Sequence, residues 1–350
     1  MSKKNKDKNC CKTSIGGQAL IEGIMMQNPN GKAAVSVRCP DGTIDTQEIS
    51  VSHAKEKFKP LGWPMIRGIV NYVESMIFGY KCLMISADKS GLEDMEESEE
   101  NMSKLDKWLN AHINKKVMNV LTGIASIIGV ALAFLLFFYL PTVIVDFINK
   151  LAGESLDNFR ALFEGVIRMA IFVIYIAAVS LMKDIKRTFM YHGAEHKTIF
   201  CYEKGLELNV ENVRKQSRFH PRCGTSFIFV IIIISVIISS ALSIFTDLRD
   251  NTILWMVTKI MILPIVTGLS YEFIRYAGRH DNFVVKILAA PGLWMQRLTT
   301  KEPDDSMIEV ALSAFIEVLD DKEREKYKQK ECEPVSDEHT IEENLEETER

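Results

Sequence analysis

The chain has 350 residues, 25% of them charged, and a net charge of −4. It shows no basic surface interleaved with aromatic residues, which argues against nucleic-acid binding. Apolar residues gather in long runs and charges gather in tails and loops, which excludes two or three ordinary soluble domains and indicates a polytopic membrane protein.

The N-terminal part is polar and precedes the apolar runs. Residues 1–12 form a basic tail with five lysines, and no apolar segment of a signal peptide follows it. Residues 13–59 are expected to form a cytosolic region. Within it, Ala33–Cys39 and Thr43–Val51 predict two strands joined by the turn residues 40–42, Pro-Asp-Gly. The sequence therefore predicts a small β-hairpin.

Residues 60–87 are apolar but carry one polar stripe at helical spacing, formed by Arg67, Asn71, Glu74 and Ser75. This pattern is typical of an amphipathic helix. We expect the helix to lie in the membrane interface or to pack against the membrane helices. A re-entrant segment or a fifth span is the alternative.

An acidic linker, residues 88–103, leads to four apolar runs of about the 20 residues that a spanning helix needs. The predicted spans are 117–140, 162–182, 227–245 and 253–271. The loop between the second and third spans, 183–226, carries nine Lys/Arg, against two and one in the other connections. The positive-inside rule places this loop in the cytosol. The predicted fold is a mainly α-helical, multi-pass plasma-membrane protein with about four spans and both termini cytosolic.

Three charged residues fall within the predicted spans. Glu164 and Arg168 are one helical turn apart near the outer end of the second span, which predicts an interfacial ion pair. Lys259 lies two turns into the fourth span and is expected to snorkel outward. One lysine and Pro264 do not make the paired broken helices of a transporter.

The C-terminal part contains a cytosolic helical region, residues 272–322, and an acidic tail, residues 323–350, expected to be disordered. Ser306 and Glu309 predict a capping box at the start of an amphipathic helix in the first of these regions.

The predicted cytosolic loop holds the residues that are best suited to bind a metal or to catalyse a reaction. His192 and His196 flank Glu195 in a reversed zincin pattern, His-x-x-Glu-His, and lie on one face of a helix. His220 and Cys223 follow in a His-x-x-Cys pattern. These two pairs predict a divalent metal site with ligands His192, His196, His220 and Cys223, for which zinc fits best because it prefers imidazole and thiolate ligands. Glu195 is the predicted catalytic acid/base.

Other interpretations of these residues remain open. The two helical histidines are alternatively a polar surface pair near lipid headgroups. Glu272, at the cytosolic end of the fourth span, is a candidate further ligand, or else pairs with Arg275 or a loop cation. A complete set of four protein ligands indicates a structural metal in a membrane scaffold or accessory factor, whereas an open position indicates a hydrolase. A site at the cytosolic face of the bilayer indicates a lipid, a membrane-protein segment or a peptide as substrate.

Four sequence blocks resemble the motifs of the YqhQ family, uncharacterised bacterial membrane proteins often labelled predicted metal-dependent enzymes. The blocks are Gly16–Met26, Tyr191–Lys197, His220–Ser226 and Leu298–Asp305. The resemblance runs from about Ile15 to Leu319. It implies roles for the five residues of the predicted site, and unspecified roles for Gln18, Glu22 and Glu302.

Overall fold

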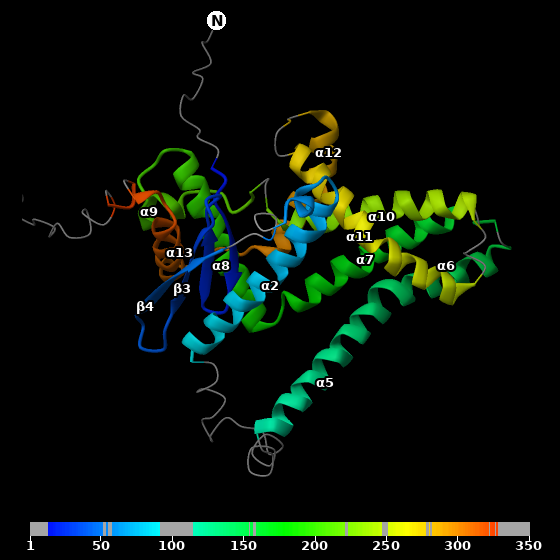
Figure 1. Cartoon of the computed structure of the whole chain (residues 1–350), viewed down its shortest axis with the longest axis horizontal. Helices are drawn as coiled ribbons and strands as arrows, with labels where there is room; N and C mark the ends of the chain where they lie inside the picture. Colours follow the sequence, from blue (N-terminus) through cyan, green and yellow to red (C-terminus); the bar gives the residue numbers. More distant parts are fainter. Residues whose placement is uncertain are drawn as a thin grey trace, which may run out of the picture.

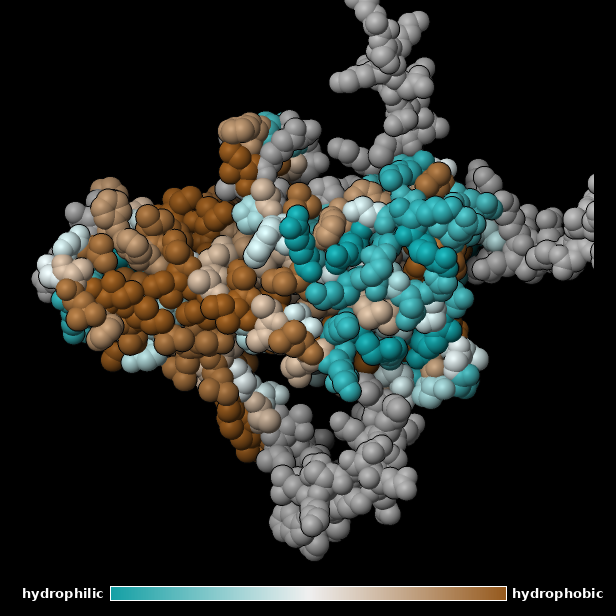
Figure 2. Space-filling model, turned by 180° about the vertical axis from the view of Figure 1, so that it is seen from behind, coloured by the Kyte–Doolittle hydropathy of each residue, from teal (hydrophilic) through white to brown (hydrophobic). Residues whose placement is uncertain are grey.

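A computed structural model describes residues 13–51, 54, 58–91, 115–153, 155–156, 159–220, 223–246, 251–277, 280, 282–321, 323–325 and 327. The predicted basic tail, most of the acidic linker and most of the acidic C-terminal tail lie outside these ranges. The described chain has two parts, a β-sheet covered by helices and a bundle of long apolar helices (Figure 1). The surface follows the same division, with apolar residues over the bundle and hydrophilic residues over the sheet part (Figure 2).

The sheet is an antiparallel meander in the order β1-β2-β3-β4. Its strands are β1 (Gly16–Leu20), β2 (Gly23–Gln27), β3 (Lys32–Arg38) and β4 (Ile44–Ser50). The last two are the predicted hairpin, which is confirmed. Strands β1 and β2 were not predicted, because β1 is rich in small residues and β2 is buried on both faces and does not alternate.

Helices cover both faces of the sheet. On one face α8 (Lys183–Glu203) and α13 (Asp305–Glu317) enclose the larger core, which includes Ile24, Met26 and Phe315. On the other face α2 (Ile66–Lys89) packs through Cys82 onto Leu20 and Val35. The sheet is therefore the middle layer, and α8 is fixed against it.

The start of α13 differs from the prediction. Its N-cap is Asp304, whose side chain accepts a hydrogen bond from Met307 N at 3.0 Å. Ser306 lies inside the helix and donates to Asp304 Oδ1, and Glu309 pairs with Arg38. The prediction of a Ser306–Glu309 capping box was wrong, because the carboxylate of Asp304, two residues before Ser306, caps the helix instead.

The apolar bundle contains α5 (Lys115–Phe134), the π-helical turn η2 (Leu135–Tyr139), α6 (Leu140–Leu151), α7 (Arg160–Val179), α10 (Thr225–Phe245), α11 (Thr252–Ala277) and α12 (Phe283–Thr299). Among the described residues, three helical stretches are long and apolar enough to cross a membrane: Gly123–Leu151, Arg160–Val179 and Thr252–Ala277. Phe227–Ser243 is a shorter apolar helix. The first stretch runs beyond the predicted end of its span, because the π-helical turn accommodates Pro141.

Two of the three charged residues predicted within the spans pair with each other. Lys259 Nζ lies 2.5 Å from Glu164 Oε2 and 3.0 Å from Thr142 Oγ1, and Lys259 is only 4% exposed. Arg168 donates to Phe137 O, in the π-helical turn, at 2.9 Å. The predictions of a snorkelling Lys259 and of a Glu164–Arg168 ion pair were therefore wrong, because Lys259 pairs with the Glu164 carboxylate of α7.

The predicted amphipathic helix is α2, and its polar stripe faces inward. Asn71 donates to the hydroxyl of Tyr271 on α11 at 2.7 Å, and Gly68 packs against Gly268 of the same helix. Its outward face is apolar and includes Ile77 and Tyr80. α2 therefore links the sheet to the apolar bundle.

Candidate metal centre

The His-x-x-Glu-His segment lies in the middle of α8, which is separated from α7 by a break at residues 180–182. Met182, the N-cap residue, has extended backbone angles, and α8 turns away to pack against β1 and α13. The site is therefore held by the sheet part and does not extend upward from the bundle.

Three predicted ligands converge. The available ligand atoms of His192, His196 and Cys223 all lie within 4.8 Å of one another. Cys223 Sγ is 3.3 Å from His192 Nε2, and the two imidazole centroids are 4.4 Å apart. Cys223 lies two residues before the start of α10, so the segment that leads into this helix carries the thiol to the histidine pair. The chain thus brings together two nitrogens and one sulfur from segments 27 residues apart.

Backbone carbonyls orient both imidazoles. His192 Nδ1 lies 2.9 Å from Thr299 O, and His196 Nδ1 lies 2.6 Å from Arg218 O. A carbonyl oxygen only accepts hydrogen bonds, so each Nδ1 carries the proton and each Nε2 keeps its lone pair. Ligating histidines commonly donate their second ring N–H to a backbone carbonyl in this way, which fixes the ring orientation. The donor set of two imidazoles and a thiol fits zinc, and it leaves a fourth position for another ligand.

Glu195 lies beside the three donors, toward the sheet. It is 6% exposed, and its carboxyl carbon lies 3.0 Å from the position that a Cβ would take at Gly17 of β1. Burial raises the pKa of Glu195, while His192 and the Gly17 N–H act in the opposite direction. A buried carboxyl group next to a donor cluster is a candidate proton acceptor.

The structure places His220 behind His196, outside the three-atom cluster. Its ring lies 5.6 Å from the His196 ring, and its Nε2 is 3.7 Å from Glu203 Oε2. Both of its backbone polar groups bond the side-chain amide of Gln296 at 2.7 Å. In this arrangement His220 packs behind the His196 ring and does not belong to the group of three ligand atoms.

Glu272 lies away from the cluster. Its carboxylate accepts a hydrogen bond from Arg67 Nε at 2.6 Å, on α2. Glu272 thus pairs with Arg67 of α2, and not with Arg275 or a loop cation, and it lies outside the group of three donors.

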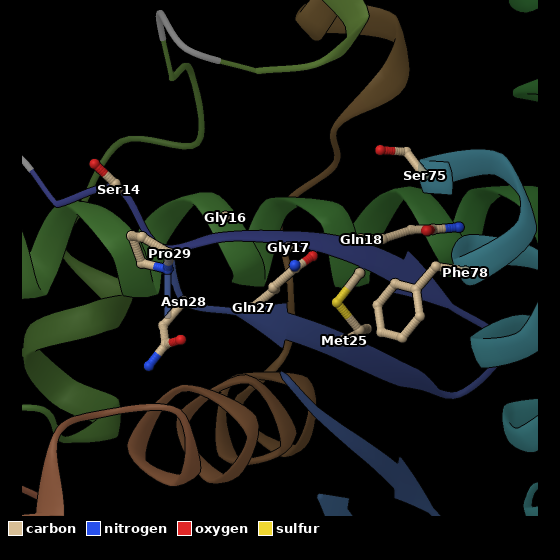
Figure 3. Close-up of a pocket in the computed structure, with 10 residues that line it drawn as sticks. All are labelled: Ser14, Gly16, Gly17, Gln18, Met25, Gln27, Asn28, Pro29, Ser75 and Phe78. Carbon is tan, nitrogen blue, oxygen red and sulfur yellow. The ribbon is translucent and has the colours of Figure 1, made fainter. Parts of the chain in front are cut away.

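Two of the remaining motif residues, Glu22 and Glu302, bind side chains of α8. Glu22 accepts hydrogen bonds from Arg187 Nε at 2.5 Å and from the hydroxyl of Tyr191 at 3.2 Å. Glu302 pairs with the buried Lys197. Gln18 lies against Gly79 of α2 and lines a cavity (Figure 3).

Sequence reasoning missed two contributors. In the segment 299–301, the carbonyl oxygen of Thr299 accepts a hydrogen bond from His192, and the backbone N–H of Lys301 donates one to Phe189 O at 2.8 Å. Gly193 permits this close approach, since a Cβ there would overlap the carbonyl oxygen of Lys301. A glycine in the middle of a helical motif is the signal that could have indicated it.

These features define a helical protein of membrane-like composition, with a sheet-bound part that presents two imidazoles and a thiol. The chain belongs to the family described as "Protein of unknown function (DUF1385)", whose model matches residues 63–321. It is 34% identical over 310 residues to "Uncharacterized protein YqhQ" of Bacillus subtilis (strain 168), covering 87% of this chain and 92% of that protein. The resemblance seen in the motifs is thereby confirmed. No solved structure matches the chain.

Proposed function

We propose that this chain is a membrane-bound, metal-dependent hydrolase that acts at the cytosolic membrane surface. The observation that carries the proposal is the convergence of His192, His196 and Cys223 with their ligand atoms within 4.8 Å. Backbone carbonyl oxygens orient both imidazoles, as they commonly do for ligating histidines, which favours a site over an accidental cluster. Zinc is the expected ion.

The proposed chemistry divides between the ion and the chain. A zinc ion held by these three residues supplies Lewis acidity toward a carbonyl or phosphoryl oxygen. Glu195 accepts a proton from the attacking water and returns it to the leaving group. Thr299 O and Arg218 O keep the two imidazoles in the ligating tautomer.

The site's position supports action near a bilayer. Cys223 is two residues from α10, and α8 begins four residues after α7 ends. Substrates that fit this position are lipids and segments of membrane proteins. The orientation that we propose, with both termini in the cytosol, follows from the nine Lys/Arg between residues 183 and 226.

A non-enzymatic scaffold with a structural metal is the second candidate. His220 favours this candidate, because its ring lies 5.6 Å from the His196 ring and would supply a fourth metal ligand after a side-chain rotation. Ligand count separates the two functions, since three protein ligands fit the hydrolase and four fit the scaffold.

The test is hydrolysis by purified protein in nanodiscs, offered phospholipid vesicles and reduced casein as separate substrates. We expect hydrolysis of one of them to stop with 1,10-phenanthroline and to return with zinc. Glu195→Gln should lower the rate by about 100-fold or more, while His280→Ala, a histidine on the exposed surface, should leave it unchanged. Chelator-insensitive hydrolysis, or full activity in Glu195→Gln, contradicts the proposal.

A further inference from the structure

Two chain segments outside α8 orient the imidazoles of the candidate metal centre. One is the end of α12, where Thr299 O accepts from His192, and the other follows α9 (Val210–Arg214), where Arg218 O accepts from His196. Neither carbonyl belongs to the helix that carries the histidines. The orientation of both rings therefore depends on what holds these two segments against α8.

The first such contact is made by Lys197, a buried cation on α8. Lys197 follows His196 directly and is 3% exposed. Its ammonium donates to Arg214 O, the carbonyl of the last residue of α9, at 2.8 Å, and to the carboxylate of Glu302. A buried charge is costly unless it is paired and hydrogen-bonded. The environment of Lys197 is therefore favourable only while both segments stay in contact with α8.

The carboxylate of Glu302 joins the two segments to each other. Its Oε1 accepts from Lys197, and its Oε2 lies 3.8 Å from Arg218 Nε. The guanidinium of Arg218 also donates from Nη1 to Thr300 O. One carboxylate thus connects α8, the segment that ends α12, and the residue whose carbonyl oxygen orients His196.

A second ion pair joins the same two segments at the surface of the protein. Arg214 Nε donates to Asp305 Oδ1 at 2.8 Å, and the two side chains are 55% and 54% exposed. Among the described residues, these two side chains form hydrogen bonds only with each other. Exposed ion pairs contribute little to stability, so this pair is a matched control for Glu302.

We propose that Glu302 is a positioning residue of the metal centre. Through Lys197 and Arg218 it keeps the carbonyl oxygens of Arg218 and Thr299 in place behind the two imidazoles. The inference rests on the metal centre of the proposed function, and it assigns a role to a residue outside the group of three ligands. Metal affinity depends on such supporting contacts, because they hold the ligands in the binding geometry.

The test is zinc affinity, measured by competition with a chelator on the full-length protein in nanodiscs. Glu302→Gln keeps the shape of the side chain and removes its charge. Asp305→Asn removes the exposed ion pair between the same two segments. Asn28→Ala removes the 2.9 Å hydrogen bond to Val318 O, which is buried and lies outside this region, and so controls for a general loss of stability.

We expect Glu302→Gln to weaken zinc binding by about 10–100-fold, and the two control variants to change it by less than about twofold. Lys197→Met should cause a similar loss. Lys197→Met combined with Glu302→Gln should lose little more than either alone, because residues of one network are not additive.

Cobalt substitution adds a readout that a general loss of stability does not change. The absorption bands of bound Co²⁺ report the geometry of its ligands. We expect Glu302→Gln to shift these bands and Asn28→Ala to leave them unchanged. Wild-type zinc affinity in Glu302→Gln, an equal loss in either control variant, or unshifted cobalt bands would overturn the inference.

The positioning role and the proposed function fail separately in these experiments. If the wild type hydrolyses its substrate with zinc and Glu302→Gln binds zinc equally well, the positioning role fails and the hydrolase stands. If Glu302→Gln alone loses zinc affinity and the zinc-loaded wild type hydrolyses nothing, the hydrolase fails and the positioning role stands. Folded wild type that binds no zinc overturns both.

Discussion

Gly193→Ala tests how tightly α8 is packed against the segment that orients the site. A Cβ at Gly193 would overlap the carbonyl oxygen of Lys301 and lie 3.3 Å from Pro303 Cδ. The backbone would have to move by roughly 1 Å, a strain of about 1–3 kcal/mol. Alanine is otherwise favoured over glycine in a helix by about 1 kcal/mol. We expect a net loss of up to about 2 kcal/mol in the free energy of unfolding.

The same displacement should weaken zinc binding. Thr299, two residues before Lys301, accepts the hydrogen bond that orients His192, and loss of such a partner lowers metal affinity by about 10–100-fold. Urea unfolding in mild detergent and chelator competition measure the two effects. Gly129→Ala is the control: nothing lies within 4 Å of its Cβ, so it should stabilise. Equal stabilisation and unchanged zinc affinity in Gly193→Ala would refute the close packing.

Three further predictions concern stability and reactivity. Glu164→Gln should lower the free energy of unfolding by about 3 kcal/mol, because it leaves the buried Lys259 without its carboxylate, and Glu164→Leu with Lys259→Met should recover most of it; equal unfolding of single and double variants contradicts the pair. Asn28→Ala, which removes the 2.9 Å bond to Val318 O, should cost about 2 kcal/mol by urea unfolding, and no loss would show that this bond is dispensable. Burial raises the pKa of the Cys201 thiol to about 11, so its alkylation, followed by peptide mass spectrometry, should rise about tenfold per pH unit from 8 to 9; a rate that levels off below pH 9 argues against burial.

The sequence predicted the features that depend on local patterns. The β3–β4 hairpin follows from alternation and a Pro-Asp-Gly turn, and the apolar helices follow from runs of apolar residues. The pairing of His192 with His196 follows from helical spacing alone. Each of these is set within a few residues of chain.

The features that the sequence did not predict depend on distant contacts. Strands β1 and β2 are defined by their burial between α2 and α8. Glu272 pairs with Arg67, 205 residues earlier, and Lys259 pairs with Glu164, 95 residues earlier. The His-x-x-Cys spacing of His220 and Cys223 is typical of a pair of metal ligands. In the structure, hydrogen bonds from the Gln296 side chain hold the His220 backbone behind His196. No short sequence pattern determines these long-range contacts.

The metal centre formed by His192, His196 and Cys223 underlies the proposed function. The most direct test is the zinc content of purified protein, combined with X-ray absorption at the zinc edge. We expect about one zinc per chain with one sulfur ligand near 2.3 Å and two imidazoles near 2.0 Å. His196→Ala and Cys223→Ser should lose the zinc, and His220→Ala should keep it. Well-folded protein without zinc, or zinc retained in both ligand variants, would contradict the account.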